Sequence, residues 1–400
     1  MRHHAARRVY LTFNAVSALL NGSIFTVYSL YFVTIAHLSP LELVLAGTAL
    51  EISIFVFEIP TGIVADVYSR RLSILIGYFI IGLGFLVTGL LPFFGWILLG
   101  QMLWGLGYTF TSGASQAWIS DEIGEENAGT AFLQATRLNN IGGVLGVSLT
   151  LLLSFSGVQA PIILGGTLYL LLSIYLLLFM PENGFRPTPA AERSSWQRMA
   201  DTLHNGLNMV RKRPALGLIL GIGFMYGLYS EGYDRLSAAH LLNRFTFQAW
   251  PEMVGWFALL NAGGMILSAL GLSWLEKRPP TRPHKIAAAL LFSSTGIIAG
   301  LFTFALTHNF ALAIATNLCI HMLRSINEPL YTAWVNHRLD SQVRATVLSF
   351  SSQVDAFGQI AGGPLIGLLA QRTDLQSGLL GSAFLLTPVL LLIALQLHRE

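Results

Sequence analysis

Charged residues are scarce in this chain of 400 residues. They make up 11% of the sequence, against the quarter that is usual for soluble domains, while 54% of the residues are hydrophobic and the mean hydropathy is +0.62. So little charge cannot cover a water-exposed surface, which excludes a soluble enzyme of one or two ordinary domains and a disordered chain. The net charge of +3 is too small and too scattered to indicate nucleic-acid binding.

Cysteine is nearly absent as well. The single residue, Cys319, excludes an internal disulfide and any metal site built from paired cysteines. His240, His321 and His337 stand in no HxxxH or HExxH pattern, so we expect packing roles and no metal site. The chain also lacks a Walker motif and a nucleophile–base pairing. We therefore expect neither an enzyme nor an ATP-driven pump, and no cofactor.

Long apolar runs, by contrast, fill the chain. A membrane-spanning helix needs about 20 mainly apolar residues. Twelve segments meet that length: 9–36, 41–66, 71–91, 95–120, 130–154, 160–180, 215–242, 251–275, 285–306, 309–337, 345–370 and 376–397. The 39 glycines favour close helix packing, as in Gly142-x-x-x-Gly146 and Gly358-x-x-x-Gly362. The sequence predicts an all-α membrane protein with twelve transmembrane helices.

Lysine and arginine are distributed unevenly over the loops between these segments. If the N-terminus is cytoplasmic, eighteen of the 23 fall on the inner side, two (Arg244 and Arg372) on the outer side, and three (Arg137, Arg235 and Arg324) within helices. Cytoplasmic loops of membrane proteins carry the excess of these residues. We therefore expect both termini in the cytoplasm of a multi-pass protein of the inner (plasma) membrane. The first apolar run is too long for a cleaved signal peptide and is expected to remain as a helix.

The chain divides around its longest polar stretch. We expect an N-terminal six-helix bundle over 1–181, a cytoplasmic linker over 182–214 and a C-terminal six-helix bundle over 215–400. Ser194 to Gln197 resembles a capping box, and apolar residues at helical spacing follow it, which predicts a short amphipathic helix on the membrane surface. An ordinary solvated loop is the alternative.

The two halves also resemble each other in sequence. A shift of 216 residues pairs Ala117-Trp118 with Ala333-Trp334, and it pairs Gly142 and Gly146 with Gly358 and Gly362. Two similar six-helix halves are typical of transporters, in which the substrate site lies near the membrane midplane between the halves. The sequence thus predicts two pseudo-symmetric bundles and a transport function.

The loop after the second predicted helix carries the most specific motif. Gly62-Ile63-Val64-Ala65-Asp66-Val67-Tyr68-Ser69-Arg70-Arg71 matches the GxxxDxxxRR motif of the major facilitator superfamily, which the chain resembles over nearly its whole length. In that family the motif's Asp and Arg form a charge network with the fourth and eleventh helices that holds one conformation. The resemblance therefore implies a conformational gate of Gly62, Asp66, Arg70, Arg71 and the partner Asp121. A basic turn with no such role is the alternative.

Three shorter stretches resemble the drug:proton antiporter branch, which contains tetracycline and macrolide efflux proteins. They are Phe57 to Gly62, Ile119 to Glu122 and Ser230 to Arg235. Two positions depart from that branch. Gln101 stands where many proton antiporters carry an arginine in the fourth helix, and the fifth helix lacks the proline of the antiporter motif, of which Gly358 to Gly367 is a closer copy.

Several ionisable residues fall within the predicted spans, where each costs at least about 2.5 kcal/mol on insertion scales. Glu51, Arg137 and Asp355 lie nearest the midplane. We expect Asp355 first and Glu51 second to carry the coupling ion, with Arg324 and Arg137 close enough in depth to alter their proton affinity. Candidate residues of a substrate cavity are Asn21, Glu58, Glu231, Asp234 and Glu328.

The alternative role for these charges is structural, as ion pairs that fix helix packing, for example Arg324 with Glu328. Aromatic residues are also candidates for lining a cavity or for ordinary packing: Phe55, Tyr108, Phe110, Trp118, Tyr226, Tyr331 and Trp334. The six acids within the spans outnumber the three arginines, which favours a cationic or zwitterionic substrate over an anion.

The sequence therefore predicts a secondary transporter that works by alternating access. We expect a proton-coupled exporter of amphipathic cationic or zwitterionic drug-like molecules. A facilitator-type transporter of a small metabolite is the alternative. The expected partners are a small-molecule substrate, a coupling ion (H⁺) and the lipid bilayer, but no nucleic acid, and we expect a monomer to be functional.

Overall fold

A computed structural model describes residues 2–187, 214–280, 282–337 and 341–397, together with isolated positions between 188 and 213. These residues form helices joined by short loops, and no strand occurs among them. The predicted amphipathic helix around residues 194–210 lies outside the described residues.

Each of the twelve predicted spans corresponds to one helix or to two helices in succession. The first six spans are α1 (Arg2–Thr34), α2 (Pro40–Ile63) with a π-helical turn (Val64–Tyr68), α3 (Arg70–Leu90), α4 (Phe94–Thr111) with α5 (Ala114–Ile123), α6 (Glu125–Leu153) and α7 (Ala160–Phe179). The last six are α9 (Pro214–Arg244), α10 (Trp250–Lys277), α11 (Pro283–Leu306), α12 (Phe310–His337), α13 (Ser341–Arg372) and α14 (Leu375–Leu386) with α15 (Pro388–Leu397). The predicted number of helices is confirmed.

Two of the spans are interrupted for local reasons that the sequence shows. Gly113 separates α4 from α5 with a φ of 71°, a conformation that costs glycine little. Pro388 begins α15 because proline has no N–H to continue the hydrogen bonding of α14, and the first turn of a helix tolerates it. The pairs α4 with α5 and α14 with α15 therefore each form one span whose helix axis changes direction at the interruption.

Within the described chain, eight of the twelve spans are long and apolar enough to cross a membrane, and four fall short of that measure. The four are α4, α9, α12 and α13. Charged side chains lower the mean hydropathy of three of them, among them Asp234 in α9, Arg324 in α12 and Asp355 in α13. The same three helices form most of the polar cavity described below.

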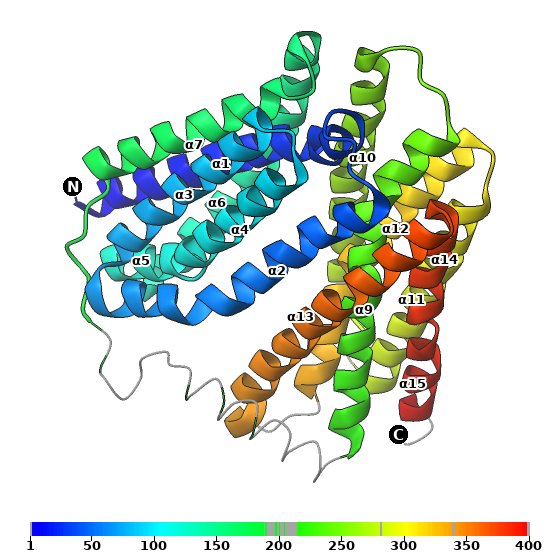
Figure 1. The fold of residues 1–400 in the computed structure, drawn as a ribbon. Helices are drawn as coiled ribbons and strands as arrows, with labels where there is room; N and C mark the ends of the chain where they lie inside the picture. Colours follow the sequence, from blue (N-terminus) through cyan, green and yellow to red (C-terminus); the bar gives the residue numbers. More distant parts are fainter. Residues whose placement is uncertain are drawn as a thin grey trace. The chain divides into compact units, whose positions relative to one another are not determined.

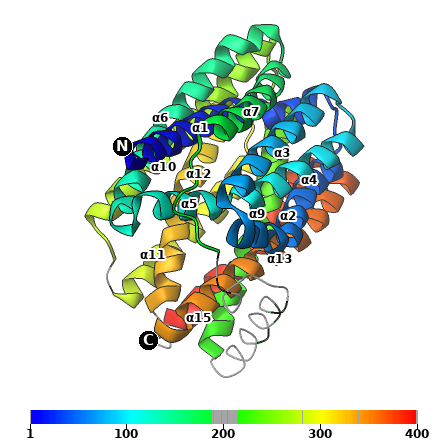
Figure 2. The same ribbon diagram turned by 90° about the vertical axis from the view of Figure 1, so that its left-hand side faces the viewer.

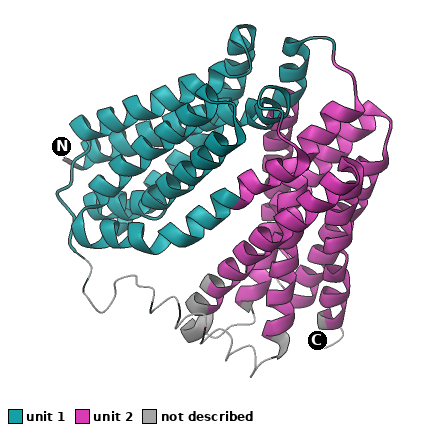
Figure 3. Ribbon diagram, viewed as in Figure 1, with its two compact units in different colours: residues 1–37, 49–198, 248–258 teal, residues 38–48, 199–247, 259–400 magenta. Residues whose placement is uncertain are grey.

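The helices gather into two compact units (Figure 3). Unit 1 contains residues 1–37, 49–198 and 248–258. Within it α1 packs along α6 and α7, and α3 packs along α4 and α7, as Figures 1 and 2 both show. Its core is rich in aromatic rings, such as those of Tyr78 and Tyr169, which stack with 5.8 Å between their centroids.

Unit 2 contains residues 38–48, 199–247 and 259–400. Within it α9 packs along α13 and α14, and α11 packs along α12 and α14. These pairs repeat those of unit 1, since α9 with α13 corresponds to α1 with α6, and α11 with α12 corresponds to α3 with α4. The repeat predicted from the shift of 216 residues is therefore present in the helix packing.

The glycine pairs singled out in the sequence lie at equivalent helix contacts. A Cβ on Gly142 would lie 2.7 Å from the carbonyl oxygen of Ala15, and one on Gly358 would lie 2.9 Å from the backbone nitrogen of Leu228. Gly146 and Gly362 likewise face the backbones of α1 and α9. Because no side chain intervenes, the two backbones approach closely in each unit.

The paired tryptophans serve packing, which is one of the two roles that the sequence left open for them. Trp118 and Trp334 are 1% and 0% exposed. The indole N–H of Trp118 donates to the carbonyl oxygen of Pro181 at 2.7 Å, so it attaches α5 to the segment after α7. Tryptophan suits this role because it fills volume and still satisfies its polar atom.

We expect Gly146→Ala to destabilise the protein. Its Cβ would lie 2.7 Å from the backbone nitrogen of Ser23, and overpacking of this kind costs about 1–3 kcal/mol. Gly129 in the same helix has no atom within 4 Å of an added Cβ, so Gly129→Ala serves as the control. Alanine favours a helix over glycine by up to about 1 kcal/mol. Thermal unfolding in detergent should therefore show a lower Tm only for Gly146→Ala, and equal shifts would contradict the packing argument.

Candidate functional site

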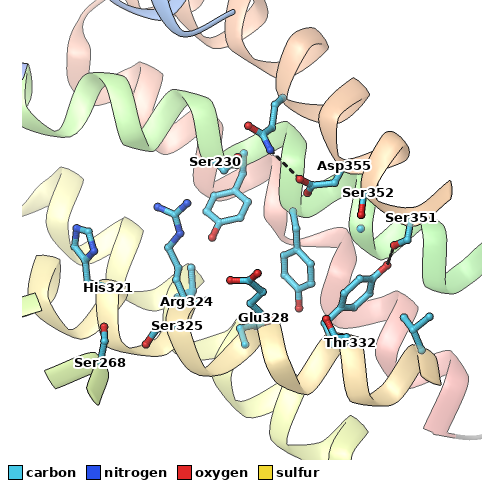
Figure 4. A pocket seen from close by; sticks show the side chains of 18 residues that line it. Ser230, Ser268, His321, Arg324, Ser325, Glu328, Thr332, Ser351, Ser352 and Asp355 are labelled. Atoms are coloured by element: carbon cyan, nitrogen blue, oxygen red, sulfur yellow. Dashed lines mark hydrogen bonds between the residues drawn. The ribbon is translucent and has the colours of Figure 1, made fainter. Parts of the chain in front are cut away.

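Unit 2 contains a polar cavity of about 730 Å³. Its wall comes mainly from α9, α12 and α13, with single residues of α10 and α11 (Figure 4). The lining residues are Gly223, Tyr226, Tyr229, Ser230, Ser268, Ile297, His321, Arg324, Ser325, Asn327, Glu328, Tyr331, Thr332, Val335, Ser351, Ser352, Asp355 and Gln359. A volume of this size is within the range that holds a small organic molecule.

Three charged side chains predicted from the sequence meet in this cavity. Arg324 and Glu328 lie one turn apart on α12, and Asp355 reaches the cavity from α13. Figure 4 shows Glu328 and Asp355 directed into the same space from their two helices. Polar groups on otherwise apolar helices are thus kept from lipid by facing the interior of the unit.

Arg324 is held in an ion pair with Asp234 of α9. Its two terminal nitrogens bond to the two carboxylate oxygens, and the Nη2–Oδ2 distance is 2.9 Å. Its Cζ also lies 5.8 Å and 5.6 Å from the ring centroids of Tyr229 and Tyr233. The forked geometry is the strong form of such a pair. The alternative pairing of Arg324 with Glu328 is therefore wrong.

The two acids of the cavity, Glu328 and Asp355, are situated differently from the paired Arg324. The amide of Gln359 donates to Asp355 Oδ2 at 2.8 Å. Among the described residues, no lysine, arginine or histidine lies within ion-pair distance of Glu328 or Asp355. With Arg324 neutralised by Asp234, the cavity therefore offers two carboxylates to a ligand and no free arginine from its own wall.

Tyrosine rings and hydroxyl groups make up another part of the wall. The Tyr226 hydroxyl lies 2.7 Å from Ser294 Oγ, and the Tyr331 hydroxyl donates to the carbonyl oxygen of Ile219 at 3.0 Å. The two rings meet edge to face with centroids 5.8 Å apart. Asn327 donates to Ser293 Oγ at 3.0 Å and so extends this network. These bonds fix the ring orientations before any ligand arrives.

Glu231 lies away from the cavity wall. It is 3% exposed, and Arg235 Nε donates to its carboxylate at 3.1 Å. Gly47, in the part of α2 that belongs to unit 2, lies directly against this pair, because a Cβ there would contact both side chains. The position suits a structural ion pair, and Glu231 as a cavity residue stays a prediction.

The remaining candidates for substrate or ion binding lie in unit 1. Asn21 accepts a hydrogen bond of 2.7 Å from the Tyr169 hydroxyl. Glu51 is partly exposed, while Glu58 and Arg137 are exposed side chains of α2 and α6. None of these four lines the cavity of unit 2. Their roles stay predictions.

The predicted gate residues also lie in unit 1. Asp66 lies on the π-helical turn that ends α2, and Arg70 begins α3. Arg70 forms an ion pair with Asp121 of α5, as the motif suggested. Gly62 lies in the last turn of α2. The structure therefore joins the loop after α2 to the end of the fourth span, and the gating role itself stays a prediction.

Glu182 holds the start of α3 beside this pair, which the sequence had not suggested. Its carboxylate accepts from the Arg71 backbone N–H at 2.9 Å and from the Ser69 hydroxyl at 2.6 Å. Ser69 in turn caps α3 by accepting from the Leu72 N–H at 2.8 Å. A carboxylate at a helix N-terminus is favoured by the free N–H groups and the helix dipole. Glu182 follows a proline in a turn, so no helical spacing marks it.

Tyr229 and His321 are cavity residues that the sequence interpretation missed or assigned to packing. A signal for them exists in the spacing. His321, Arg324, Glu328, Tyr331 and Val335 recur every three or four residues along α12 and all line the cavity. Tyr226, Tyr229 and Ser230 form the corresponding stripe on α9. Two such stripes on predicted neighbouring helices define a common polar interior.

Two pseudo-symmetric six-helix units and a polar cavity inside one of them define a membrane transporter of the secondary type. Residues 11–363 match the Major Facilitator Superfamily, and the chain belongs to this family. It is a multi-pass membrane transporter and not an enzyme.

Similar proteins agree with this assignment. The uncharacterized MFS-type transporter YxaM of Bacillus subtilis (strain 168) is 25% identical over 391 residues, which is 96% of this chain and 94% of YxaM. The nucleoside transporter NupG has a similar fold, with a TM-score of 0.77 and 15% identity over 99% of this chain and 99% of NupG. The POT family transporter PepTSo gives a TM-score of 0.70 at 14% identity over 98% and 97% of the two chains. These structural likenesses show the fold alone.

We expect Asp66→Asn to abolish transport without preventing membrane insertion. The residue lies on the turn that precedes the Arg70–Asp121 ion pair, so the change should alter the balance of conformations and leave ligand binding intact. Transport by the purified variant in proteoliposomes and ligand binding in detergent measure the two effects separately. Glu126→Gln, on the exposed side of α6, is the control. Full transport by Asp66→Asn at normal expression would show that Asp66 is not part of the gate.

Proposed function

We propose that the chain is a proton-coupled exporter of amphipathic cationic or zwitterionic molecules and that the cavity of unit 2 binds them. The observation that carries the proposal is the charge of this cavity. Glu328 and Asp355 face the same space, and the arginine beside them is already paired with Asp234. A cavity with this balance attracts a positive group and repels an anion.

The tyrosine rings support the same class of substrate. Tyr226, Tyr229 and Tyr331 present aromatic surface to the cavity. An organic cation gains about 0.5–2 kcal/mol from the face of an aromatic ring, and the apolar part of an amphipathic molecule packs against the same rings. The carboxylates suit the positive group of an amphipathic cation, and the aromatic rings suit its apolar part.

A transporter of a small polar metabolite is the second candidate. The hydroxyl and amide groups of the wall favour it, for example Ser325, Thr332 and Asn327, since these groups orient a polar ligand by hydrogen bonds. The two candidates differ in whether binding depends on the charge of the ligand. The cationic class is preferred because two carboxylates without an arginine partner would be costly around a neutral solute.

The coupling step is proposed to use the same acids. A proton on Asp355 or Glu328 removes one of the two negative charges of the cavity when no substrate is present, and a cation replaces that proton when it binds. Asp355 is the first choice because only Gln359 bonds to it among the described residues, which leaves one of its oxygens open to exchange. Glu51 in unit 1 is the second choice. Outward transport is proposed from the sequence resemblance to drug efflux proteins. We further propose an inner-membrane location, cytoplasmic termini and a functional monomer.

Glu328→Gln is expected to weaken binding of an organic cation about tenfold, which corresponds to about 1.4 kcal/mol. Tetraphenylphosphonium is a suitable probe because it is cationic and aromatic, and fluorescein is the anionic comparison. Glu276→Gln removes an exposed carboxylate at the end of α10 and should leave the affinity unchanged. Equilibrium binding to the purified protein measures both. Tight binding of fluorescein and none of tetraphenylphosphonium would contradict the proposed substrate class.

Asp355→Asn is expected to uncouple transport from the pH gradient. The amide keeps the size of the side chain but carries no exchangeable charge, so proteoliposomes with the variant should lose uphill transport while binding and passive exchange persist. The control is Asp374→Asn, in the loop before α14, where the Ser377 backbone N–H lowers the pKa of Asp374 by bonding to its carboxylate. Concentration of substrate by Asp355→Asn with the pH dependence of the unmodified protein would assign Asp355 a structural role.

A further inference from the structure

We infer that Asp234 determines which charge the cavity accepts, because it neutralises Arg324. Arg324 lines the cavity, whereas Asp234 is not among its lining residues. The inference rests on the proposed function, since it assumes that substrate binds in this cavity. The inference narrows the substrate class to cations without a carboxylate group. It assigns this selectivity to Asp234, which lies outside the cavity wall.

The geometry leaves Arg324 little capacity to bind a ligand's carboxylate. Both terminal nitrogens of its guanidinium are engaged by the two oxygens of Asp234. Its flat face lies near the rings of Tyr229 and Tyr233. Asp234 occupies the two terminal nitrogens and neutralises the guanidinium charge, so a ligand's carboxylate gains less from Arg324 while this pair is formed.

The charged groups around the Arg324–Asp234 pair are themselves paired or acidic, so the neutrality of this pair decides whether a free positive charge faces the cavity. Next to Asp234 on α9, Arg235 is paired with buried Glu231, so it adds no free charge. On α12, His321 precedes Arg324 by one turn and Glu328 follows it by one turn. If Asp234 loses its charge, Arg324 becomes free to bind either Glu328 or a carboxylate on the ligand. In both cases the cavity binds a cation more weakly. If Arg324 is free for the ligand's carboxylate, the cavity also gains a site for a zwitterion.

A purely structural pair would behave differently. The pair joins α9 to α12, so removal of one partner leaves an unmatched charge and lowers stability, while removal of both restores it in part. That pattern concerns folding and does not change which ligand is preferred. The ratio of affinities for two ligands that differ only in a carboxylate therefore separates the two roles.

Rhodamine 6G and rhodamine 19 are such ligands, since the first is a cationic ester and the second is its zwitterionic free acid. The test measures equilibrium binding of both dyes to the full-length purified protein. We expect the unmodified protein to prefer rhodamine 6G. Asp234→Asn should shift the ratio of affinities about tenfold toward rhodamine 19, and Asp234→Glu should leave it unchanged. The double variant Asp234→Asn with Arg324→Gln should return the ratio to that of the unmodified protein.

Arg324→Gln keeps the test decisive if Asp234→Asn does not fold. This variant frees the carboxylate of Asp234, so the ratio should shift further toward rhodamine 6G. Unchanged ratios in every folded variant would overturn the inference and leave a structural pair. Glu328→Gln distinguishes failure of the proposed binding site from failure of the role of Asp234. If it alters neither dye's affinity, the proposed cavity is not the binding site, whereas an effect of Glu328→Gln with unchanged ratios in the Asp234 and Arg324 variants refutes only the role of Asp234.

Discussion

The cost of placing a charge in hydrocarbon is the constraint on which the rest of this structure depends. Ionisable side chains in the middle of α9, α12 and α13 must be paired or must face a polar interior. Arg324 and Asp234 meet the first condition, while Glu328 and Asp355 meet the second by pointing into one cavity. The helices that carry them could not be exposed to lipid on that face, so the polar stripes dictate how the helices are rotated within unit 2.

Close helix packing makes such a cavity possible. Gly358 and Gly362 bring α13 against the backbone of α9, and Gly142 and Gly146 do the same for α6 and α1 in unit 1. Direct backbone contact at these points fixes the helix pairs without large side chains. The side chains on the adjoining faces of α9 and α13, such as Tyr226 and Asp355, are then held at the cavity wall by rigid helices. Rigid helices keep the lining side chains in fixed positions toward one another.

The two charged regions have different chemical requirements. The cluster around Arg70 and Asp121 connects the ends of helices, and Glu182 secures the start of α3 beside it. A contact of this kind joins two elements and needs no room for a ligand. The cavity of unit 2, which we propose as the substrate site, must in addition discriminate among ligands, and this requires carboxylates that remain available. In that proposal the pairing of Arg324 with Asp234 supplies the difference, because it neutralises the arginine that lines the described part of the wall.

The number and extent of the helices, the internal repeat and the glycine contacts followed from the sequence, since each depends on apolar length or on a fixed spacing along one helix. The approach of Arg70 to Asp121 followed from a motif. The partner of Arg324 did not. Spacing alone places Glu328 four residues after Arg324, but an acid that follows a base in this way pairs less well than one that precedes it. Glu231 precedes Arg235 by four residues, and that pair forms.

Only the packing of α9 against the other helices of unit 2 decided that Asp234 would reach Arg324 and that Glu328 and Asp355 would share one cavity. These residues lie far apart in the sequence, and their meeting depends on how each helix is rotated about its axis. That rotation is set by all the contacts of the unit together. Glu182 illustrates the same limit, because its partners Ser69 and Arg71 are brought to it by the packing of α3 against α7. A sequence defines the face of a helix on which a residue lies, but the tertiary structure decides what that face meets.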